Sequence, residues 1–373
     1  IAVCLAGDLR GGPNVLQSVI DHVLKPLRAE TFVYMPLTSD SPTLQELALL
    51  RAIPGLKGLR VEVENATASL LSEAMQRQPE KKKAQMVVEL TRQIGGNWLG
   101  GLEETAPSAL MGQAGSDHRW RRPGSGLYQQ LSWRRCIEQV QSAEAAAGGK
   151  RYDWVVASRP NIMWEHDHIP LELLSTDAIW VPEGMDWGGL NDRHAAIPRG
   201  AAPAPANGMP SLMDLYLDAF RFLADGKAVA ALMAAIESDT TKDVAAWGCD
   251  ERVDGPVSYP CINMETWLAV RLRATETRVR RLPRIDWVLC ELGKVQAKPA
   301  PYITWPNSRL CREQGTPYRY VDEYNSARAM AQCLRNSGWS PDTKLEGIRK
   351  AISTCWCHSA GAEAALRHVD EST

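Results

Sequence analysis

The first 36 residues read IAVCLAGDLRGGPNVLQSVIDHVLKPLRAETFVYMP, and this stretch decides the fold. Ile1 to Ala6 is a short apolar run that ends at Gly7, as a buried strand does. The segment from Asn14 to Leu27 carries apolar residues at helical spacing, and Thr31 to Met35 is β-branched and aromatic. Strand, helix and strand in this order form a βαβ unit, which predicts a parallel sheet.

Strands and helices continue to alternate along the chain. Helical spacing of apolar residues is found over 44–52, 69–76, 81–94, 127–147, 211–223, 228–238 and 264–274. Runs typical of strands cover 59–63, 153–158, 178–181 and 277–282. Residues 95–126 are rich in glycine and lack a period, which predicts a long surface loop. The expected fold class is α/β, with a mostly parallel sheet flanked by helices.

The domain organisation follows from where this alternation stops. Residues 1–290 are expected to form one α/β domain, and residues 291–373 an irregular extension packed on it, with one helix near 345–353. Five of the nine cysteines lie beyond residue 289, which favours stapling of the extension by disulfides. The cysteines and the Asn65-Ala66-Thr67 sequon favour the lumen of the secretory pathway, such as the Golgi, or the extracellular space, with the cytoplasm left open.

Charge and hydropathy limit the partners. The net charge of −2 makes electrostatic capture of nucleic acid or of an anionic membrane unexpected. No apolar run approaches the roughly 20 residues that span a bilayer, so no membrane contact is expected. Because Ile1 opens directly into a strand, we expect any leader or membrane anchor to have preceded it.

Two polar segments follow predicted strands, where ligands bind in open α/β sheets. Gly7-Asp8-Leu9-Arg10 is a glycine-containing turn in which Arg10 could grip a phosphate, or a plain turn with a solvated arginine. The strand Asp153 to Ser158 runs into Arg159-Pro160-Asn161, where Arg159 could balance anionic charge. Beyond it, the sequence Trp164-Glu165-His166-Asp167-His168 supplies oxygen and nitrogen atoms for a divalent ion, although a polar surface loop would look the same.

Two further segments offer carboxylates. Gly188-Gly189-Leu190-Asn191-Asp192-Arg193-His194 is expected to be a tight turn, in which Asp192 could act as a general base. Glu265 opens a largely apolar helix, where a carboxylate is favoured by the helix dipole even without any catalytic role.

The ordered set of these segments resembles a loosely defined group of GT-A-like glycosyltransferases of bacteria, algae and large viruses. Those proteins combine a G-x-L-R turn, a Y-D-x-V-V-x-x-R-P-D strand, a G-G-x-N-D-R turn and an N-x-E helix start. Here the corresponding segments are Gly7 to Arg10, Tyr152 to Asn161, Gly188 to Arg193 and Asn263 to Glu265. The resemblance covers roughly residues 1–290 and implies a GT-A-like (Rossmann-like) fold.

The resemblance also implies an activity, the transfer of a sugar from a nucleotide-diphosphate donor to a hydroxyl of a glycan or glycoprotein acceptor. Residues implied to bind the donor nucleotide are Gly7, Asp8, Arg10, Arg159 and Asn161. Residues implied to bind the acceptor are Trp187, Asn191 and Arg193. Glu265 is favoured as the base and Asp192 as a ligand of sugar hydroxyls, with the anomeric outcome left open.

The metal requirement is where this chain departs from the family pattern. Asn161 stands where the family has the aspartate that holds a divalent ion against the diphosphate. Dependence on Mn²⁺ or Mg²⁺ is therefore implied only if neighbours such as Asp167 and His168 complete the ligand set with Asn161, or else arginines replace the ion.

Other functions fit the same residues. A sulfotransferase would place a phosphosulfate donor on the turn after the first strand, although Asp8 there opposes a multiply anionic ligand. A non-catalytic, secreted carbohydrate-binding protein would use some of the 13 tryptophans as faces for sugars. A metallohydrolase would use His166, Asp167 and His168.

Overall fold

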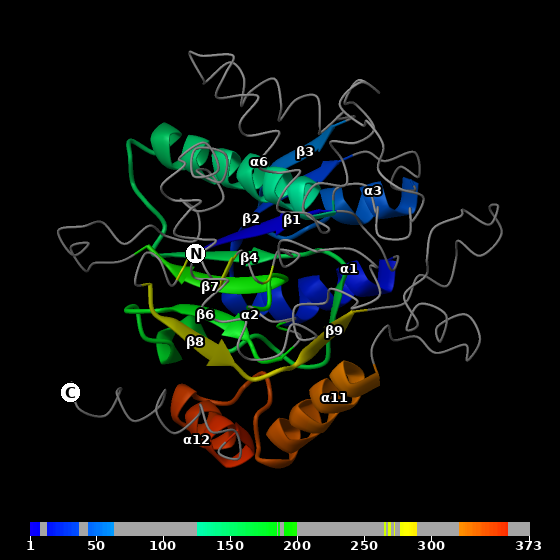
Figure 1. Ribbon diagram of the computed structural model, residues 1–373, viewed down its shortest axis with the longest axis vertical. Coiled ribbons are helices and arrows are strands. Elements are labelled where there is room, and N and C mark those ends of the chain that lie inside the picture. Colours follow the sequence, from blue (N-terminus) through cyan, green and yellow to red (C-terminus); the bar gives the residue numbers. More distant parts are fainter. Residues whose placement is uncertain are drawn as a thin grey trace, which may run out of the picture.

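The computed structural model describes residues 1–7, 13–36, 44–62, 125–184, 186, 190–199, 265, 268–269, 272, 277–288 and 321–356. Its centre is a seven-stranded sheet in the order β3-β2-β1-β4-β7-β6-β8 (Figure 1). The strands are β1 (Ala2–Ala6), β2 (Glu30–Pro36), β3 (Leu56–Glu62), β4 (Trp154–Ser158), β6 (Ile179–Pro182), β7 (His194–Pro198) and β8 (Val279–Leu282). A second, two-stranded sheet pairs β5 (Ile162–Trp164) with β9 (Asp286–Val288).

The direction of the strands confirms the predicted α/β class. β3, β2, β1 and β4 are mutually parallel, and β6 is parallel to β8. β7 is the exception, because it runs antiparallel to both β4 and β6. β5, β7 and β9 were not predicted from the sequence, whereas the strands corresponding to β1, β2, β3, β4, β6 and β8 were. The chain is therefore a mostly parallel, mixed α/β protein.

The first βαβ unit is formed as predicted. Between β1 and β2 the chain makes α1 (Pro13–Val19), a π-helical turn η1 (Ile20–Leu24) and α2 (Lys25–Leu27), and Arg28 ends the run at φ 48°. The apolar face of this helical run shares one core with alternate residues of β1, Val3 and Leu5. α3 (Leu44–Arg51) follows β2, as expected.

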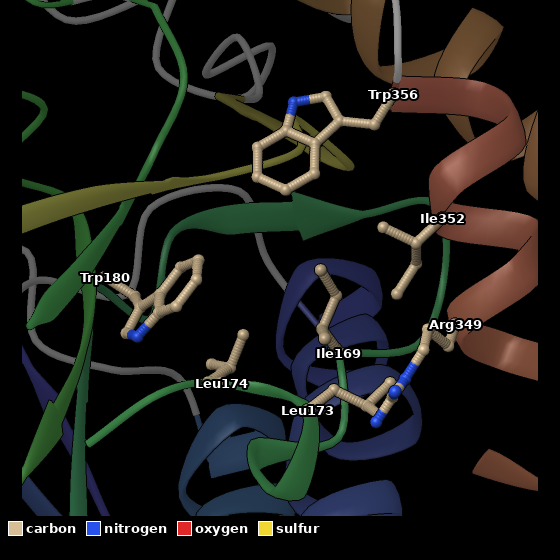
Figure 2. A pocket seen from close by; sticks show the side chains of 7 residues that line it. All are labelled: Ile169, Leu173, Leu174, Trp180, Arg349, Ile352 and Trp356. Atoms are coloured by element: carbon tan, nitrogen blue, oxygen red, sulfur yellow. The ribbon is translucent and has the colours of Figure 1, made fainter. Parts of the chain in front are cut away.

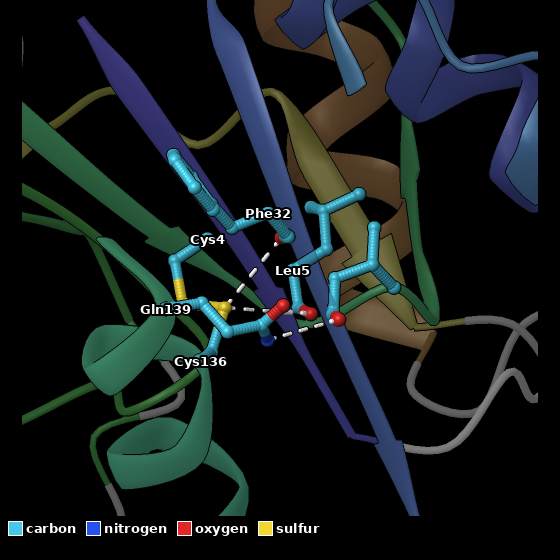
Figure 3. Close-up of a disulfide and its surroundings, with 6 residues drawn as sticks. Cys4, Leu5, Phe32, Cys136 and Gln139 are labelled. Carbon is cyan, nitrogen blue, oxygen red and sulfur yellow. Dashed lines mark hydrogen bonds between the residues drawn. A yellow bond between two sulfur atoms is a disulfide. The ribbon is translucent and has the colours of Figure 1, made fainter. Parts of the chain in front are cut away.

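The other face of β1 and β2 is covered by α6 (Ser125–Ala146). Cys136 of α6 is joined by a disulfide to Cys4 of β1, and Gln139, one turn further on, donates from Nε2 to the Val33 carbonyl at 3.2 Å (Figure 3). The Cys136 sulfur also lies 3.5 Å from the Phe32 carbonyl oxygen, a contact without a proton because the sulfur is in the disulfide. α6 is thus fastened to β1, which leads to Gly7, and to the neighbouring strand β2.

In the described part of the C-terminal extension, the helix expected near 345–353 is confirmed, whereas the expectation of irregular structure is wrong for residues 321–336, which form a second helix. α11 (Val321–Asn336) and α12 (Leu345–Trp356) pack together at one end of the molecule, and α11 contacts β9 (Figure 1). Among the described residues of the extension, the predicted stapling is seen in the disulfide between Cys333 and Cys355. This disulfide and the one between Cys4 and Cys136 are compatible with a secreted or lumenal protein.

Several predictions fall on residues that the structure does not describe. They are the helices over 69–76, 81–94, 211–223 and 228–238, the site residues Asp8, Arg10 and Trp187, and the loop over 95–126 except its last two residues, which belong to α6. Among the helices that are described, none combines the length and apolar character required to cross a membrane.

Candidate functional site

The candidate site lies at the carboxyl ends of the neighbouring parallel strands β1 and β4. Gly7 follows β1 with φ +122°, a conformation that side chains other than glycine's rarely adopt, and its N–H donates to the Tyr34 carbonyl at 3.1 Å. A Cβ placed on Gly7 would lie 3.8 Å from Cδ of Pro160, which follows β4. The two segments predicted to bind the donor, at Gly7 and at Arg159 to Asn161, are therefore neighbours.

The antiparallel strand β7 brings the Asn191-Asp192-Arg193 segment to the same place. Ser158 at the end of β4 pairs with His194 at the start of β7, and the Arg159 N–H donates to the Arg193 carbonyl at 2.9 Å. The residues just before β7 must then lie beside those just after β4. This pairing, absent from the sequence prediction, explains why Arg159, Asp192 and Arg193 share one edge of the sheet.

Glu265 joins this group from a distant part of the chain. Its carbonyl accepts a hydrogen bond from the Leu190 N–H at 2.9 Å. Burial raises the pKa of the Glu265 carboxyl to about 8, with repulsion from Asp192 adding to the rise and attraction by Arg193 and Arg159 opposing it. These three charges therefore act on the Glu265 carboxyl, and the hydrogen bond from Leu190 places the Glu265 backbone beside the turn that carries Asp192 and Arg193.

Arg159, Asp192, Arg193 and Glu265 differ in access to solvent. Arg159 and Glu265 are partly exposed, whereas Asp192 and Arg193 are buried, with 5% and 6% of their surface exposed. Arg159 is therefore within reach of a ligand at the surface, whereas the carboxyl group of Glu265 lies in a largely buried environment.

Asp192 is oriented by a residue that the sequence analysis missed. Gln129 of α6 donates from Nε2 to Oδ2 of Asp192 at 2.8 Å, and the same nitrogen lies 3.1 Å from the Asp192 carbonyl oxygen. Nothing in the local sequence marks this glutamine, because its role depends on where α6 packs.

The turn before β7 is built from its own polar side chains. Asn191 is buried, donates from Nδ2 to the Gly184 carbonyl at 3.1 Å and accepts at Oδ1 from the Arg193 N–H at 3.0 Å. Its own N–H donates to Asp186, whose carboxylate also receives two hydrogen bonds, of 2.8 and 3.1 Å, from Arg281 of β8. Asn191 therefore fixes the turn, and its predicted contact with an acceptor stays a prediction.

Arg193 faces a second set of carboxyl groups on its other side. Its guanidinium donates to Oε1 of Glu323, a buried residue of α11. Burial and repulsion by Glu323 raise the pKa of buried Asp286, in β9, to about 7, while Arg193 and Arg284 oppose the rise. The sequence analysis missed Asp286 and Glu323, and Arg193 makes its hydrogen bond to Glu323 inside the protein.

The residues predicted to hold a metal ion do not form a ligand set. Oδ1 of Asn161 is buried and has no hydrogen-bond partner among the described residues, so it could serve as one ligand. The Asp167 carboxylate, however, lies 2.7 Å from Nδ1 of His22, and both ring nitrogens of His168 are engaged, at 2.6 Å from the Ile169 carbonyl and 3.0 Å from Nε2 of His194. The described part of the chain holds no cluster of three His, Cys, Asp or Glu side chains suited to a metal.

The two histidines form a buried neutral pair. Burial lowers the pKa of His168 to about 4, and burial together with repulsion from His168 lowers the pKa of His194 well below its usual value. Since the Ile169 carbonyl can only accept, Nδ1 of His168 carries a proton and Nε2 of His194 donates to Nε2 of His168. His168 is therefore occupied in packing the core beside Trp164.

A cavity elsewhere in the protein does not compete as a substrate site. It holds about 20 Å³ and is lined by Ile169, Leu173, Leu174, Trp180, Arg349, Ile352 and Trp356 (Figure 2). A space of this size can hold about one water molecule. It is a packing gap between α12 and the segment leading to β6.

Searches with protein-family models, among curated proteins and among solved structures found no match to this chain, so no relative assigns the fold family or the chemistry of this site.

Proposed function

We propose that this protein is a glycosyltransferase that moves a sugar from a nucleoside-diphosphate donor to a hydroxyl group of a glycan or glycoprotein, with a GT-A-like α/β domain. The observation that carries the proposal is the cluster of Arg159, Asp192, Arg193 and Glu265. These residues come from three separate segments and meet at the carboxyl ends of parallel strands, where open α/β sheets bind their ligands.

The donor is proposed to lie against the ends of β1 and β4. The backbone at Gly7 can approach a ligand closely because the residue has no side chain. Arg159 is partly exposed beside it, and a guanidinium there can receive a diphosphate with two parallel hydrogen bonds. Asn161 has a buried Oδ1 without a partner among the described residues, which offers an acceptor to a hydroxyl group of the donor.

Glu265 is proposed as the general base. In the transfer step the acceptor oxygen forms a bond to the anomeric carbon of the sugar, and its proton goes to the Glu265 carboxylate. The bond from the anomeric carbon to the β-phosphate oxygen breaks, and its electron pair leaves with the nucleoside diphosphate. Arg159 stabilises the negative charge that develops on that leaving group.

The environment of Glu265 suits this role. A base works best when its pKa lies near the operating pH, and the pKa of Glu265 is raised to about 8 by burial and by Asp192. No step is assigned to Mn²⁺ or Mg²⁺, because the Asp167 carboxylate is paired with His22 and both ring nitrogens of His168 are engaged within the protein.

The direct test is hydrolysis of sugar nucleotides, since transferases slowly pass their donors to water. We expect one member of a panel of uridine- and guanosine-diphosphate sugars to release its nucleoside diphosphate, and Arg159→Gln to suppress this release strongly. Each donor is measured with and without Mn²⁺ or Mg²⁺. Arg60→Gln is the matched control, since Arg60 is partly exposed, as Arg159 is, but lies on β3, three strands from β4.

The same panel separates the competing functions. A rise in melting temperature with adenosine 3′,5′-bisphosphate, and none with any sugar nucleotide, would replace the proposal by a sulfotransferase. Glycan binding without turnover of any donor would replace it by a carbohydrate-binding protein.

A further inference from the structure

Gln129 lies at the N-terminal end of the buried stripe of α6. Trp133, Cys136 and Val140 form this stripe, four, seven and eleven positions after Gln129, so the four residues share one face of the helix. The same helix packs against β1 and β2. Where it reaches the turn before β7, the buried stripe ends in a partly exposed glutamine that contacts this turn. The helix that covers the sheet therefore also brings a polar side chain to the candidate site.

The amide of Gln129 is held in one orientation by Asp192. Its Nε2 lies 2.8 Å from Oδ2 and 3.1 Å from the carbonyl oxygen of Asp192. Both of these oxygens accept hydrogen bonds, so the atom that faces them is the nitrogen of the amide and not its oxygen. The N–H groups are thereby used inside the protein, and Oε1 is the atom left for a ligand.

The oxygen of this amide limits what can bind there. Oε1 of Gln129 has no hydrogen-bond partner among the described residues, and it is not one of the polar atoms that are buried without a partner. It is therefore open to solvent. An amide oxygen accepts a hydrogen bond from a hydroxyl or N–H group, and it has no proton to give to a phosphate, a carboxylate or a carbonyl.

Main-chain hydrogen bonds connect the turn that Gln129 contacts to the rest of the site. Asp192 precedes Arg193, whose carbonyl accepts from the Arg159 N–H at 2.9 Å. The N–H two positions before Asp192 donates to the Glu265 carbonyl at 2.9 Å. Gln129 therefore borders the turn that links the end of β4 to the proposed base.

We propose that Gln129 is a further acceptor-binding residue of the transferase, whose Oε1 accepts a hydrogen bond from a hydroxyl group of a saccharide acceptor. The inference rests on the proposed function, and it requires an acceptor with at least two hydroxyl groups, one for Glu265 and one for Gln129. Asp192 holds the amide so that its oxygen is turned outward. Asn191 and Arg193, which the resemblance assigns to the acceptor, make their hydrogen bonds within the protein.

The test is the binding of methyl glycosides without any donor. Methyl glycosides of glucose, galactose, mannose and N-acetylglucosamine are titrated by NMR into the wild type, Gln129→Lys and Gln129→Met. The lysine ammonium can still donate to Asp192 but offers no acceptor, whereas methionine removes both contacts. We expect Kd to rise about tenfold in both variants for each glycoside that the wild type binds, as the loss of one hydrogen bond does.

Fluorinated glycosides separate a contact with the ligand from support of the turn. One hydroxyl at a time is replaced by fluorine, which cannot donate a hydrogen bond. For the hydroxyl that Gln129 binds, this replacement should weaken binding to the wild type about tenfold and leave binding to Gln129→Lys unchanged, because the contact is already lost there. A loosened turn would instead weaken binding of all the analogues alike.

Gln139→Lys is the matched control. Gln139 also donates from its amide to a main-chain carbonyl, that of Val33, ten positions further along α6. This variant should bind the glycosides as the wild type does. If the wild type binds none of them, or if Gln129→Lys binds them as tightly as the wild type, the inference is overturned. Should one of the two Gln129 variants fail to fold, the other gives the answer.

The result is distinguishable from that of the proposed function. Binding of glycosides that depends on Gln129, together with no turnover of any sugar nucleotide, would remove the transferase activity and leave a saccharide site. Turnover of a donor, together with glycoside binding that Gln129→Lys does not change, would keep the transferase and remove Gln129 from its acceptor site.

Discussion

An ion pair between an arginine and a glutamate lies at each end of β7, and the surroundings of the two pairs differ. Arg193, just before the strand, pairs with Glu323 of α11, and Arg199, just after it, pairs with Glu144 of α6; the side chains of all four have low exposure. At the first end Arg193 also interacts electrostatically with the carboxyl groups of Glu265 and Asp286, and both of these have raised pKa values. At the second end Glu144 also accepts a hydrogen bond from the Tyr152 N–H at 3.0 Å, which ties the helix to the chain entering β4.

This difference suggests a purely structural role for the Arg199–Glu144 pair and a place next to a functional site for the Arg193–Glu323 pair. A buried ion pair by itself is weak evidence for function, because such pairs occur in structural roles and cost desolvation energy. What distinguishes the Arg193 end is an excess of carboxyl groups next to a partly exposed edge of the sheet. Strongly shifted carboxyl groups at such an edge are typical of active sites.

The largest functional difference between the two ends of β7 is expected at Glu265. We expect Glu265→Gln to lower the rate of sugar transfer by about 10²- to 10⁴-fold, the range typical of the loss of a general base, with the fold intact. Glu144→Gln should leave the rate unchanged once the fraction of folded protein is taken into account. The measurement is kcat with the donor identified by the hydrolysis panel, and a Glu265→Gln variant as active as the wild type would remove Glu265 from the mechanism.

The stability of the two pairs should be alike even though their functions differ. Truncating Glu323 or Glu144 to alanine leaves a buried guanidinium without its carboxylate, and we expect each to cost about 3–5 kcal/mol of unfolding free energy. Urea denaturation of the two variants checks this. A cost for Glu144→Ala far below that for Glu323→Ala would mean that the Arg199 pair is not a fair structural reference.

Removing the disulfide between α11 and α12 should weaken the attachment of α11, and so affect only the end of β7 at Arg193. Cys333 and Cys355 are separated by 22 positions, and a disulfide that closes a loop of this size contributes about 3 kcal/mol. The double variant Cys333→Ser/Cys355→Ser should therefore lower stability by about that amount. Because the disulfide ties α12 to α11, which carries Glu323, hydrogen exchange in α11 should become faster, whereas Glu144 and Arg199 keep their contacts and exchange in α6 stays unchanged.

The parallel strands of the sheet were predicted from the sequence, whereas the antiparallel strand β7 and the helix α11 were not. The apolar runs of β1, β2 and β4 and the periodic segment before β2 identified the parallel sheet, since those patterns are local. β7 was missed because its five residues, HAAIP, are mostly small and gain strand structure only through pairing with β4. α11 was missed because its buried stripe is made of Ala327, Ala331 and Leu334, which give little hydrophobic contrast.

The same limit applies to the site. Arg159, Asp192 and Glu265 could be found because each stands at the boundary of a predicted element, where ligands bind or dipoles act. Gln129 and Glu323 could not, because their contacts depend on how α6 and α11 pack against the turn before β7. The predicted metal ligands Asp167 and His168 were placed together by sequence proximity, while the folded chain turns them toward His22 and His194.

The smallest expected effect is a change in the pKa of Glu265 when Asp192 loses its charge. Repulsion from this carboxylate helps to raise the pKa of Glu265, so Asp192→Asn should lower that pKa, by about one unit, from about 8. Glu265 acts as a base only when ionised, and the acidic limb of kcat/KM should therefore move to lower pH in this variant. The stability that protonated Glu265 contributes, which the wild type loses as pH rises toward 8, should be lost over a narrower range that ends earlier.

Asp192→Asn keeps the shape of the side chain and retains an oxygen that can accept from Gln129, so the turn should remain in place. Its effect is thus one of charge, because it takes away a repulsion acting on Glu265. Glu144→Gln also removes one negative charge, but at the other end of β7, and it should leave the acidic limb in place. A limb that stays in place in Asp192→Asn as well would leave burial as the cause of the raised pKa and Asp192 as a structural support, the role Glu144 has at the other end of β7.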